Sequence, residues 1–436
     1  MPLTVGPKVG PVLCYNRSAF PNPERLVPDF FAFAGLRYDS DAAGTDLERL
    51  AAPPYDVIDE ERRAALEAAD PHNAVRLLLP RDSKRDGDRY ERAAGALAEW
   101  QESGVLRVDP APRFYTYRMQ FRGPHGEARH TRGVIGALAL PEAGDTSVLP
   151  HERTAAKAKS DRLALLRAER ANVDPIWGLS LAAGLTELLE PETMLATCTD
   201  ADGVVHELGA IDDPARIAEI RTRIGAENLV LADGHHRFET ACAYRDELRA
   251  SGQASEGADA IMMLVVELVD DELDIEPIHR LLDLPPEMDL VSQLEDAFDI
   301  SECGASSPDA IEALQARMAS DHGLGIVDNG NLLVAVARPA LRAEALADEH
   351  PAVAATDAAV VEALVMPRLP GATWRYWHDA AAVAAQVDKG TAGAAILCSP
   401  VSVALTRAAA TDRARMPQKT TFFTPKPLSG MVFRKF

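Results

Sequence analysis

Runs of apolar residues, separated by turns and by amphipathic stretches, divide the chain into predicted strands and helices. Continuous or alternating apolar positions predict strands over residues 31–37, 73–80, 113–121, 131–140, 229–232 and 260–268. Apolar positions three and four residues apart predict helices over residues 90–101 and 161–170 and from residue 235 onward. The strands at 113–121 and 131–140 are expected to form a hairpin. Both element types alternate along the chain, which predicts a mixed α/β fold.

The C-terminal part of the chain has its own set of alternating elements and predicts a second α/β subdomain. Helices are expected over residues 290–298, 309–319 and 357–365, and strands over residues 325–327, 332–336 and 394–398. Between residues 177 and 224 the pattern indicates helices and turns. We therefore expect a flexible lead-in (1–28), a core domain (29–287), the α/β subdomain (288–411) and a C-terminal segment (412–436) that returns to the core.

Composition excludes several classes of function. The chain has 436 residues, of which 47% are hydrophobic, so a sizeable core is expected. Its formal charge of -22 argues against a nucleic-acid surface, which needs basic side chains. Five cysteines without any CxxC pair indicate a reduced, cytoplasmic protein without structural zinc. No apolar stretch is long enough for a membrane span, and the first residues do not read as a signal peptide.

The densest candidate chemistry follows the predicted strand at 229–232. Asp233 and Gly234 make a turn, and the helix that follows begins with His235, His236 and Arg237. The first turn of a helix attracts anions because its N–H groups lack partners. The carboxylate and the imidazoles could move protons or bind a metal, the guanidinium matches a phosphate, and Glu239 adds a second carboxylate one turn later. The alternative is a capped surface helix with solvated histidines.

Two earlier stretches also carry polar candidates. Pro53-Pro54 fixes an extended turn that delivers Tyr55 and Asp56 in a defined direction. The alternative is a plain connection into a helix over 60–69 capped by Asp59. In the apolar run at 73–80, Arg76 must reach an edge or meet an anion, because an unpaired buried charge is costly.

Positive charge is concentrated in two places. Residues 151–170 contain six Lys or Arg against three acids, and the loop that opens this stretch carries His151, Glu152, Arg153, Thr154 and Lys157. The alternative for this loop is a solvated basic surface. Residues 413–436 contain six Lys or Arg and no acid, together with large apolar side chains that need burial. We expect this tail to be ordered and to bring Lys419 or Lys426 towards an anion.

Five motifs, in order along the chain, resemble a known bacterial and archaeal family called domain of unknown function 1015. They are Pro53-Pro-Tyr-Asp-Val-Ile58, Asn73-Ala-Val-Arg-Leu77, Leu149-Pro-His-Glu-Arg-Thr154, Ala232-Asp-Gly-His-His-Arg-Phe-Glu-Thr-Ala241 and Met416-Pro-Gln-Lys-Thr-Thr-Phe-Phe-Thr-Pro-Lys426. The resemblance adds Asn73 to the candidate binding residues. It does not supply a reaction, because the family's activity is not established.

The central motif is also similar to the Gly-x-His-Arg signature of the ParB/sulfiredoxin-like fold, whose members include nucleotide-binding clamps, sulfiredoxin and a free-serine kinase. This similarity implies a ParB/sulfiredoxin-like nucleotide-binding core in which the strand, turn and helix hold nucleotide phosphates. It also implies serine, or a similar small hydroxy compound, as a candidate acceptor.

The leading hypothesis is an enzyme that binds a nucleotide or another phosphorylated small molecule and transfers a phosphoryl group. Arg237, Arg153, Lys157 and Lys419 would bind phosphate, Asp233 or Glu239 would act as the base, and His235 or His236 would assist. Mg²⁺ and a nucleoside di- or triphosphate are the expected cofactors, and nothing in the sequence indicates flavin or NAD.

Three alternatives stay open. The same site could hydrolyse a phosphoester, or it could bind a nucleotide as a switch without turnover. His235, His236 and a carboxylate could instead hold the metal of a hydrolase. A small phosphorylated molecule is the expected partner, no nucleic acid or membrane is expected, and the sequence leaves the oligomeric state open.

Overall fold

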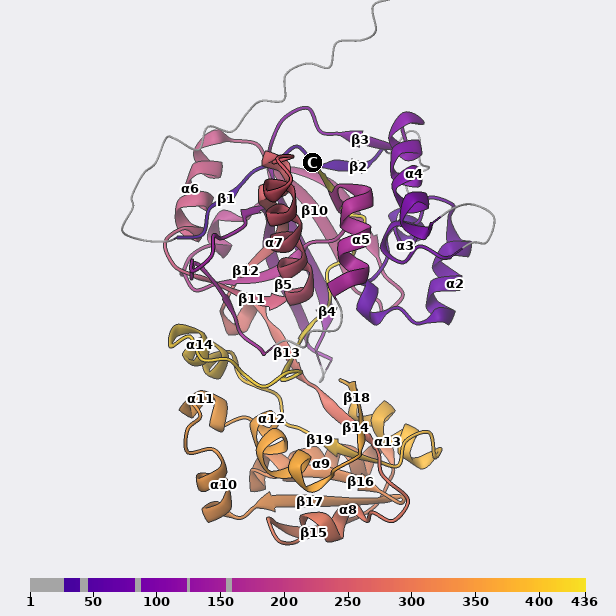
Figure 1. Cartoon of the computed structure of the whole chain (residues 1–436), viewed down its shortest axis with the longest axis vertical. Helices are drawn as coiled ribbons and strands as arrows, with labels where there is room; N and C mark the ends of the chain where they lie inside the picture. The colour runs from indigo at the N-terminus through magenta and orange to yellow at the C-terminus, as the bar shows by residue number, and fades with distance from the viewer. Residues whose placement is uncertain (1–26, 40–45, 83–87, 124–125, 154–158) are drawn as a thin grey trace, which may run out of the picture.

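A nine-stranded mixed sheet forms the centre of the first of two lobes (Figure 1). The computed structural model describes residues 27–39, 46–82, 88–123, 126–153 and 159–436, so most of the expected lead-in lies outside the described residues. The strands of this sheet are β1 (Phe30–Phe31), β4 (Phe114–Arg122), β5 (Ala128–Ala139), β6 (Val148–Pro150), β8 (Ile176–Ser180), β9 (Thr193–Thr199), β10 (Val205–Ile211), β11 (Leu229–Asp233) and β12 (Ala260–Glu267). Their order is β6-β11-β8-β12-β5-β4-β10-β9, and β1 pairs with β5. The pairs β6/β11 and β8/β12 are parallel, and the other pairs are antiparallel.

Both faces of the central strands are buried, which explains their continuous apolar runs. On one face, Ile261 and Met263 of β12 share a cluster with residues of α6 (Pro214–Ile224) and α7 (His235–Ala250). Figure 1 shows these helices, with α5 (Lys159–Glu169), over the sheet. On the other face, Met262 and Leu264 share a cluster with Phe423, Leu428, Met431 and Val432 of the C-terminal segment. The chain end thus completes the core of the first lobe.

A small helical unit lies at the edge of the first lobe. It contains α1 (Leu47–Leu50), α2 (Glu60–Ala69), α3 (Val75–Leu78), α4 (Arg89–Glu102), a 3₁₀ turn at Tyr55–Val57, and the paired strands β2 (Leu36–Tyr38) and β3 (Leu106–Val108). Its apolar side chains, among them Leu97 and Trp100, gather around Phe433 from the chain end. Further 3₁₀ turns lie at Thr186–Leu188, Glu256–Asp259 and Asp270–Glu272.

The second lobe is built on a six-stranded antiparallel sheet. Its strands are β14 (His279–Asp283), β15 (Phe298–Ala305), β16 (Leu324–Asp328), β17 (Asn331–Ala337), β18 (Thr373–Trp377) and β19 (Ala394–Leu397). They follow the order β15-β17-β16-β19-β14-β18. Thus β14, which lies before the expected boundary at residue 287, hydrogen-bonds within the second sheet, to β18 and β19.

Helices cover both faces of the second sheet. On one face the core includes residues of α9 (Pro308–Asp321) and α13 (Ala380–Asp388). The other face packs against α8 (Leu290–Leu294), α10 (Pro339–Ala345), α11 (Pro351–Ala354), α12 (Asp357–Val360) and α14 (Val403–Thr411). A π-helical turn at Val361–Val365 and a 3₁₀ turn at Met366–Arg368 follow α12.

The C-terminal segment leaves the second lobe and runs back along the first. Strand β20 (Thr421–Thr424) pairs with β13 (Asp274–Pro277), and β21 (Arg434–Lys435) pairs with β7 (Ala171–Asn172). Between these strands, Ser429 and Phe433 bridge to the backbone of Ala52 and Leu36. In Figure 1 this yellow segment passes through the waist between the lobes and ends within the first lobe.

Most of the predicted elements are confirmed, and three regions are corrected. The hairpin, the helices at 90–101 and 161–170 and the strand, turn and helix around residue 233 are present as β4/β5, α4, α5 and β11/α7. The strand expected over 73–80 is wrong, since this run forms α3. The reason is local: the side chain of Asn73 accepts the N–H of Val75 at 2.9 Å and thereby supports a helical turn. Residues 177–224, read as helices and turns, contain β9 and β10. Residues 31–37, read as one strand, are divided between β1, which pairs with β5, and β2, which pairs with β3.

The prediction of a mixed α/β fold is confirmed by a large mixed sheet and a second antiparallel sheet. None of the helices in the described ranges has the length and apolar character needed to cross a membrane.

Replacing Phe433 by alanine tests the contribution of the chain end to the core. Phe433 is fully buried and packs with its ring 5.7 Å from that of Tyr38. The cavity left by Phe433→Ala should lower the free energy of unfolding by about 3–5 kcal/mol, measured by urea unfolding followed by circular dichroism. Lys435→Ala, an exposed position two residues later, should stay within about 0.5 kcal/mol of wild type. Equal stabilities for the two variants would show that the chain end does not support the core.

Candidate functional site

The central motif has the predicted geometry of strand, turn and helix. Strand β11 ends at Asp233, Gly234 lies in the left-handed region at φ 85°, and the 16-residue helix α7 begins at His235. A Cβ on Gly234 would stand 2.6 Å from Ile176, so this turn requires glycine on grounds of space as well as of φ. Asp233 therefore directly precedes the residue that caps α7.

Asp233 is held by two cations. Its Oδ1 accepts a hydrogen bond from Nζ of Lys426 at 2.8 Å, and its Oδ2 accepts one from Nη2 of Arg237 at 3.0 Å. Burial alone would raise the pKa of Asp233, but these two cations outweigh it and hold the pKa well below its usual range. Asp233 is therefore a permanent carboxylate that orients both cations.

Arg237 points into the protein rather than into solvent. Its Nη1 donates to Asp174 and, at 2.9 Å, to the carbonyl of Pro175. The guanidinium also lies 5.9 Å from the ring centre of Tyr55, and Arg162 covers the same ring at 4.6 Å. Tyr55 thus joins the first predicted motif to the central one.

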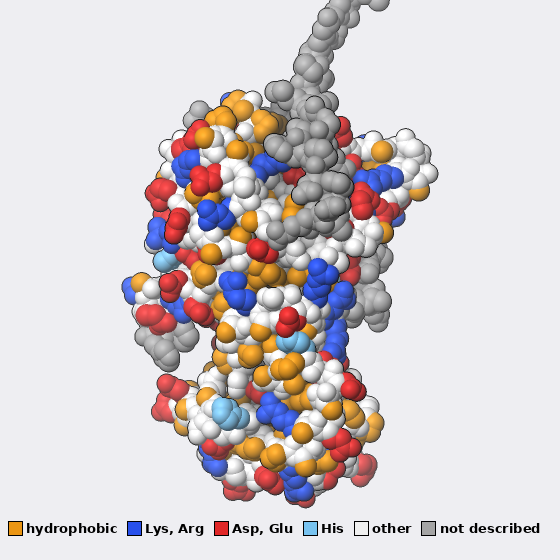
Figure 2. All heavy atoms as spheres, turned by 90° about the vertical axis from the view of Figure 1, so that its left-hand side faces the viewer, with side chains coloured by type: hydrophobic (Ala, Val, Ile, Leu, Met, Phe, Trp, Pro, Cys, Tyr) orange, Lys and Arg blue, Asp and Glu red, His pale blue; other side chains and the backbone are white. Residues whose placement is uncertain are grey.

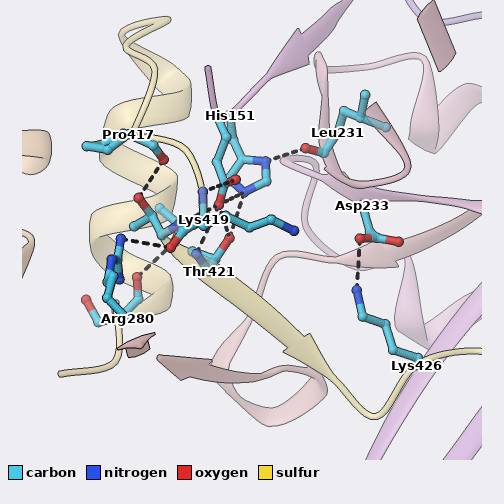
Figure 3. A network of polar contacts seen from close by, with 12 residues as sticks. His151, Leu231, Asp233, Arg280, Pro417, Lys419, Thr421 and Lys426 are labelled. Carbon is cyan, nitrogen blue, oxygen red and sulfur yellow. Dashed lines mark hydrogen bonds and ion pairs between the residues drawn. The ribbon is translucent and has the colours of Figure 1, made fainter. Parts of the chain in front are cut away.

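The loop at 151–152 is clamped to the C-terminal segment (Figure 3). Nδ1 of His151 hydrogen-bonds to the carbonyl of Leu231. Nε2 of the same ring hydrogen-bonds to Oγ1 of Thr421 at 2.8 Å. Glu152 accepts the backbone N–H groups of Lys419, Thr420 and Thr421 at 3.0–3.1 Å. Burial would raise the pKa of Glu152, but His151, the N–H of Thr421 and the nearby His235 lower it to about 2.

Lys419 is fixed through its backbone while its side chain stays exposed. Its φ of 59° is left-handed, a conformation that non-glycine residues rarely adopt. Glu152 accepts its N–H, and the buried Arg280 of β14 donates to its carbonyl at 3.1 Å. No hydrogen bond or ion pair joins its ammonium to any other described residue. In Figure 3 the side chain extends towards the side on which Asp233 and Lys426 lie.

The two histidines of the motif have buried ring nitrogens. Nε2 of His235 and Nδ1 of His236 have no hydrogen-bond partner among the described residues. The ring of His235 lies 5.1 Å from that of His151. Burial, together with His151, lowers the pKa of His235 to about 4, so this imidazole is neutral at pH 7. Glu239, one turn further along α7, opposes that shift through its negative charge.

Other predicted site residues have structural partners elsewhere. Asn73 is fully buried and donates to the carbonyls of Arg49 and Ala51. Arg76 donates to the carbonyl of Glu67 at 2.7 Å, so its partner is a helix end and not an external anion.

In the predicted basic loop that begins at residue 151, Arg153 is engaged in ion pairs within the protein. Arg153 forms ion pairs with Glu349 at 2.6 Å and Glu362 at 2.9 Å, both in the second lobe. It therefore ties the two lobes together. Thr154 and Lys157 lie outside the described residues, and Asp56 is exposed next to Tyr55. On the face shown in Figure 2, several Lys and Arg side chains gather at the waist between the lobes.

Three residues with a structural part in the site were missing from the predicted set: Asp174, Thr421 and Arg280. Asp174 follows no motif, and its contact with Arg237 spans 63 residues of sequence. Thr421 lies between the two predicted lysines, and its distance of 270 residues from His151 hid the contact. Arg280 was detectable from the sequence as a charge at the end of a predicted strand, where a site residue and a structural pair are equally expected.

Metal ligands are not grouped in this site. Among the residues that the structure describes, no set of three or more His, Cys, Asp or Glu is arranged to hold a metal ion. Asp233, one of the two carboxylates considered as a Mg²⁺ ligand together with Glu239, already uses both oxygens in ion pairs. The side chains therefore do not form a prepared metal site, and any Mg²⁺ would need ligands from a bound phosphate.

Comparison with known sequence families decides the membership of this chain. A family described as "Protein of unknown function (DUF1015)" matches residues 30–363, which is well over half of the chain. The chain belongs to this family. The matched range of the DUF1015 chain includes Tyr55, His151 and the central motif, and it ends before Lys419.

Solved structures similar to the DUF1015 chain include a conserved hypothetical protein from Pyrococcus furiosus, with 11% identity and a TM-score of 0.36 over 66% of this chain and 90% of the other. A free serine kinase in complex with AMP has 12% identity and a TM-score of 0.34 over 64% and 84% of the two chains. SbnI with a C-terminal truncation, from Staphylococcus aureus, has 10% identity and a TM-score of 0.34 over 68% and 86%. At these TM-scores the likenesses support no argument about activity. No curated protein matches the DUF1015 chain.

Glu152→Gln tests the clamp on Lys419 through its pH dependence. A carboxyl whose pKa falls from 4.5 to about 2 on folding stabilises the protein above pH 4.5 and loses that effect as the pH falls towards 2. At about 1.4 kcal/mol for each pKa unit, the variant should be less stable than wild type at pH 7 by on the order of 3 kcal/mol. The difference should shrink between pH 4.5 and 2 in urea unfolding. Glu219→Gln, at an exposed position on α6, is the control and should change stability little. If the difference in free energy of unfolding between Glu152→Gln and wild type is constant with pH, the clamp is contradicted.

Proposed function

We propose that this protein is an enzyme that binds a nucleotide or another phosphorylated small molecule and transfers a phosphoryl group. The observation that carries the proposal is the state of Lys419. Its backbone is held from both lobes while its ammonium has no partner in the described part of the chain. The side chain of Lys419 extends from this fixed backbone towards the side on which Asp233 and Lys426 lie (Figure 3). A cation positioned in this way could supply the charge that phosphoryl transfer requires.

The phosphate would lie against the first turn of α7. Gly234 lets a ligand approach the N–H groups there, and the helix dipole favours an anion at that end. Lys419 would pair with the phosphate directly. Lys426 and Arg237 would add positive potential from the positions that Asp233 fixes.

His235 is the strongest candidate for the base that activates the acceptor hydroxyl. It is neutral at pH 7 and has a ring nitrogen without a partner, so it can take a proton. Asp233, which the sequence suggested, is poorly suited because both of its oxygens are held in ion pairs with Lys426 and Arg237. Glu239 and His236 are the second candidates.

The acceptor would approach from the side of Tyr55. Asp56 is exposed there and close enough to Arg237 to influence its pKa, so it is a candidate to hold a polar acceptor. The similarity of the central motif to that of a serine kinase makes serine the first acceptor to assay. A phosphoester hydrolase would use the same groups with water as the acceptor.

The metallohydrolase alternative lacks support in the described residues. His235 and His236 are not joined by a third ligand in any arrangement suited to a metal ion. A nucleotide-binding switch would use the same phosphate contacts without the proton transfer by His235, so turnover separates the two. Mg²⁺, if needed, would be carried by the phosphates, and none of the steps proposed for the side chains uses it.

Lys419→Met tests the phosphate contact. Loss of one charged contact should weaken binding of ATP, ADP and tripolyphosphate about 10- to 100-fold, measured by isothermal titration calorimetry. Lys435→Met removes an exposed lysine of the same segment and should leave all three affinities unchanged. Equal affinities for Lys419→Met and wild type would remove the main support for the proposal.

Proton uptake tests the role of His235. A phosphate bound nearby should raise the pKa of His235 from about 4, because an anion stabilises the imidazolium. At pH 5 wild type should therefore take up a proton when tripolyphosphate binds, measured by calorimetry in buffers of different ionisation enthalpy. His235→Gln should bind tripolyphosphate but take up fewer protons than wild type, because it lacks the imidazole. If the two proteins take up protons equally, the phosphate does not lie near His235.

A further inference from the structure

A cavity of about 190 Å³ lies between the edge of the first sheet and the end of α14. Its lining comes from β6 and the turn before it, from Val230 of β11, and from the end of α14 with the residues that follow. In Figure 1 α14 lies at the left of the waist, and Figure 2, which faces that side, shows Lys and Arg side chains gathered at the waist. The cavity is smaller than a drug-sized pocket, so its size suits a small molecule.

The cavity lies on the opposite face of the first sheet from α7. Neighbouring residues of a strand point to opposite faces of their sheet. Leu229 and Leu231 of β11 share a cluster with residues of α7, whereas Val230 shares one with Ala410 of α14. Val230 and Ala410 both line the cavity, and its lining includes no residue of the turn between β11 and α7. A ligand in this cavity would therefore be separate from one bound at the first turn of α7.

Two exposed arginines, Arg413 and Arg415, line the cavity. No hydrogen bond or ion pair joins either side chain to another described residue. The acids nearby have other partners: Asp412 pairs with His350 at 2.9 Å, and Asp145 in the cavity wall accepts a backbone N–H at 2.7 Å. Two guanidinium groups against one carboxylate give the cavity a positive charge, and a cleft of one sign concentrates ions of the other.

Arg413 occupies a backbone position that usually belongs to glycine. Helix α14 ends in a Schellman motif, because the N–H of Arg413 bonds to the carbonyl of Ala410 at 3.0 Å and that of Ala414 to the carbonyl of Ala409 at 2.8 Å. The φ of Arg413 is 58°, in the left-handed region, where a side chain costs free energy relative to glycine. The arginine therefore weakens the helix end, and an anion in the cavity would give its side chain a partner.

Arg415 is held in place by its neighbour in the chain. The N–H of Met416 donates to the carbonyl of His151 at 2.7 Å, and the carbonyl of Met416 accepts the N–H of Arg153 at 3.1 Å. This pairing fixes the backbone next to Arg415 against the loop that follows β6. The guanidinium takes no part in it and stays available to a ligand.

We propose that this cavity binds a small organic anion with two negative charges, held by Arg413 and Arg415. Guanidinium groups match the oxygens of both phosphate and carboxylate, so phosphomonoesters and dicarboxylates share the required chemistry. Val148, Leu149 and Val230 give the cavity apolar walls that suit the carbon part of such a ligand. The site goes beyond the proposed function, because it uses none of the side chains that bind phosphate or move a proton there.

Isothermal titration calorimetry with phenyl phosphate and with succinate tests the proposal. Tighter binding of phenyl phosphate by wild type would assign a phosphomonoester, and tighter binding of succinate a dicarboxylate. For the tighter probe, Arg413→Gly and Arg415→Met should each weaken binding about 10- to 100-fold, the effect of losing one charged contact. Arg413→Gly should unfold at the same urea concentration as wild type or a higher one, because glycine is favoured at this φ. Weaker binding then cannot be attributed to a damaged fold.

Arg170→Gly is the matched control. Arg170 is also an exposed arginine with a left-handed φ, 48°, at the end of a helix, α5, and it does not line this cavity. Its replacement should leave the affinity for the tighter probe unchanged. If Arg170→Gly weakens binding as much as Arg413→Gly does, the effect is not specific to the cavity and the proposal fails.

Lys419→Met separates this site from the one at α7. It should leave the affinity for the tighter probe unchanged. If it weakens binding as strongly as Arg415→Met does, the anion lies at the first turn of α7, and this inference fails while the proposed function does not. If wild type binds neither probe, or if both cavity variants bind as tightly as wild type, the cavity is not an anion site.

Discussion

The return of the C-terminal segment across the first lobe is the constraint on which the site depends. Phe423, Leu428, Met431 and Val432 bury one face of the nine-stranded sheet, and hydrophobic burial drives this packing without regard to the charges nearby. Lys419 and Lys426 lie on the same segment, just before and just after β20. The force that completes the core therefore also brings Lys426 to Asp233 at the turn between β11 and α7.

Pairing of charges decides what each polar group can do there. Asp233 is neutralised by Lys426 and Arg237, so its carboxylate is structural in the free protein. Glu152 accepts hydrogen bonds from three backbone N–H groups. One of them belongs to Lys419 and supports its left-handed conformation. What remains is one ammonium without a partner in the described residues and one neutral imidazole, His235. For this reason the proposed function gives the phosphate contact to Lys419 and the proton transfer to His235.

The second lobe contributes through a few long-range contacts. Arg280 on β14 reaches the carbonyl of Lys419, and Arg153 of the first lobe pairs with Glu349 and Glu362 of the second. A change in the angle between the lobes would therefore move Lys419 relative to α7.

Local pattern in the sequence determined the elements around the turn. The apolar run before Asp233, the glycine and the amphipathic stretch after it are short-range signals, and they predicted β11, Gly234 and α7. The same reasoning failed at residues 73–80, because the side chain of Asn73 bonds to nearby backbone and outweighs an apolar run that reads as a strand. The roles of the polar residues depended on tertiary structure. Asp174 meets Arg237 and Thr421 meets His151 only because sheet pairing and core burial bring distant segments together, and no local pattern encodes those distances.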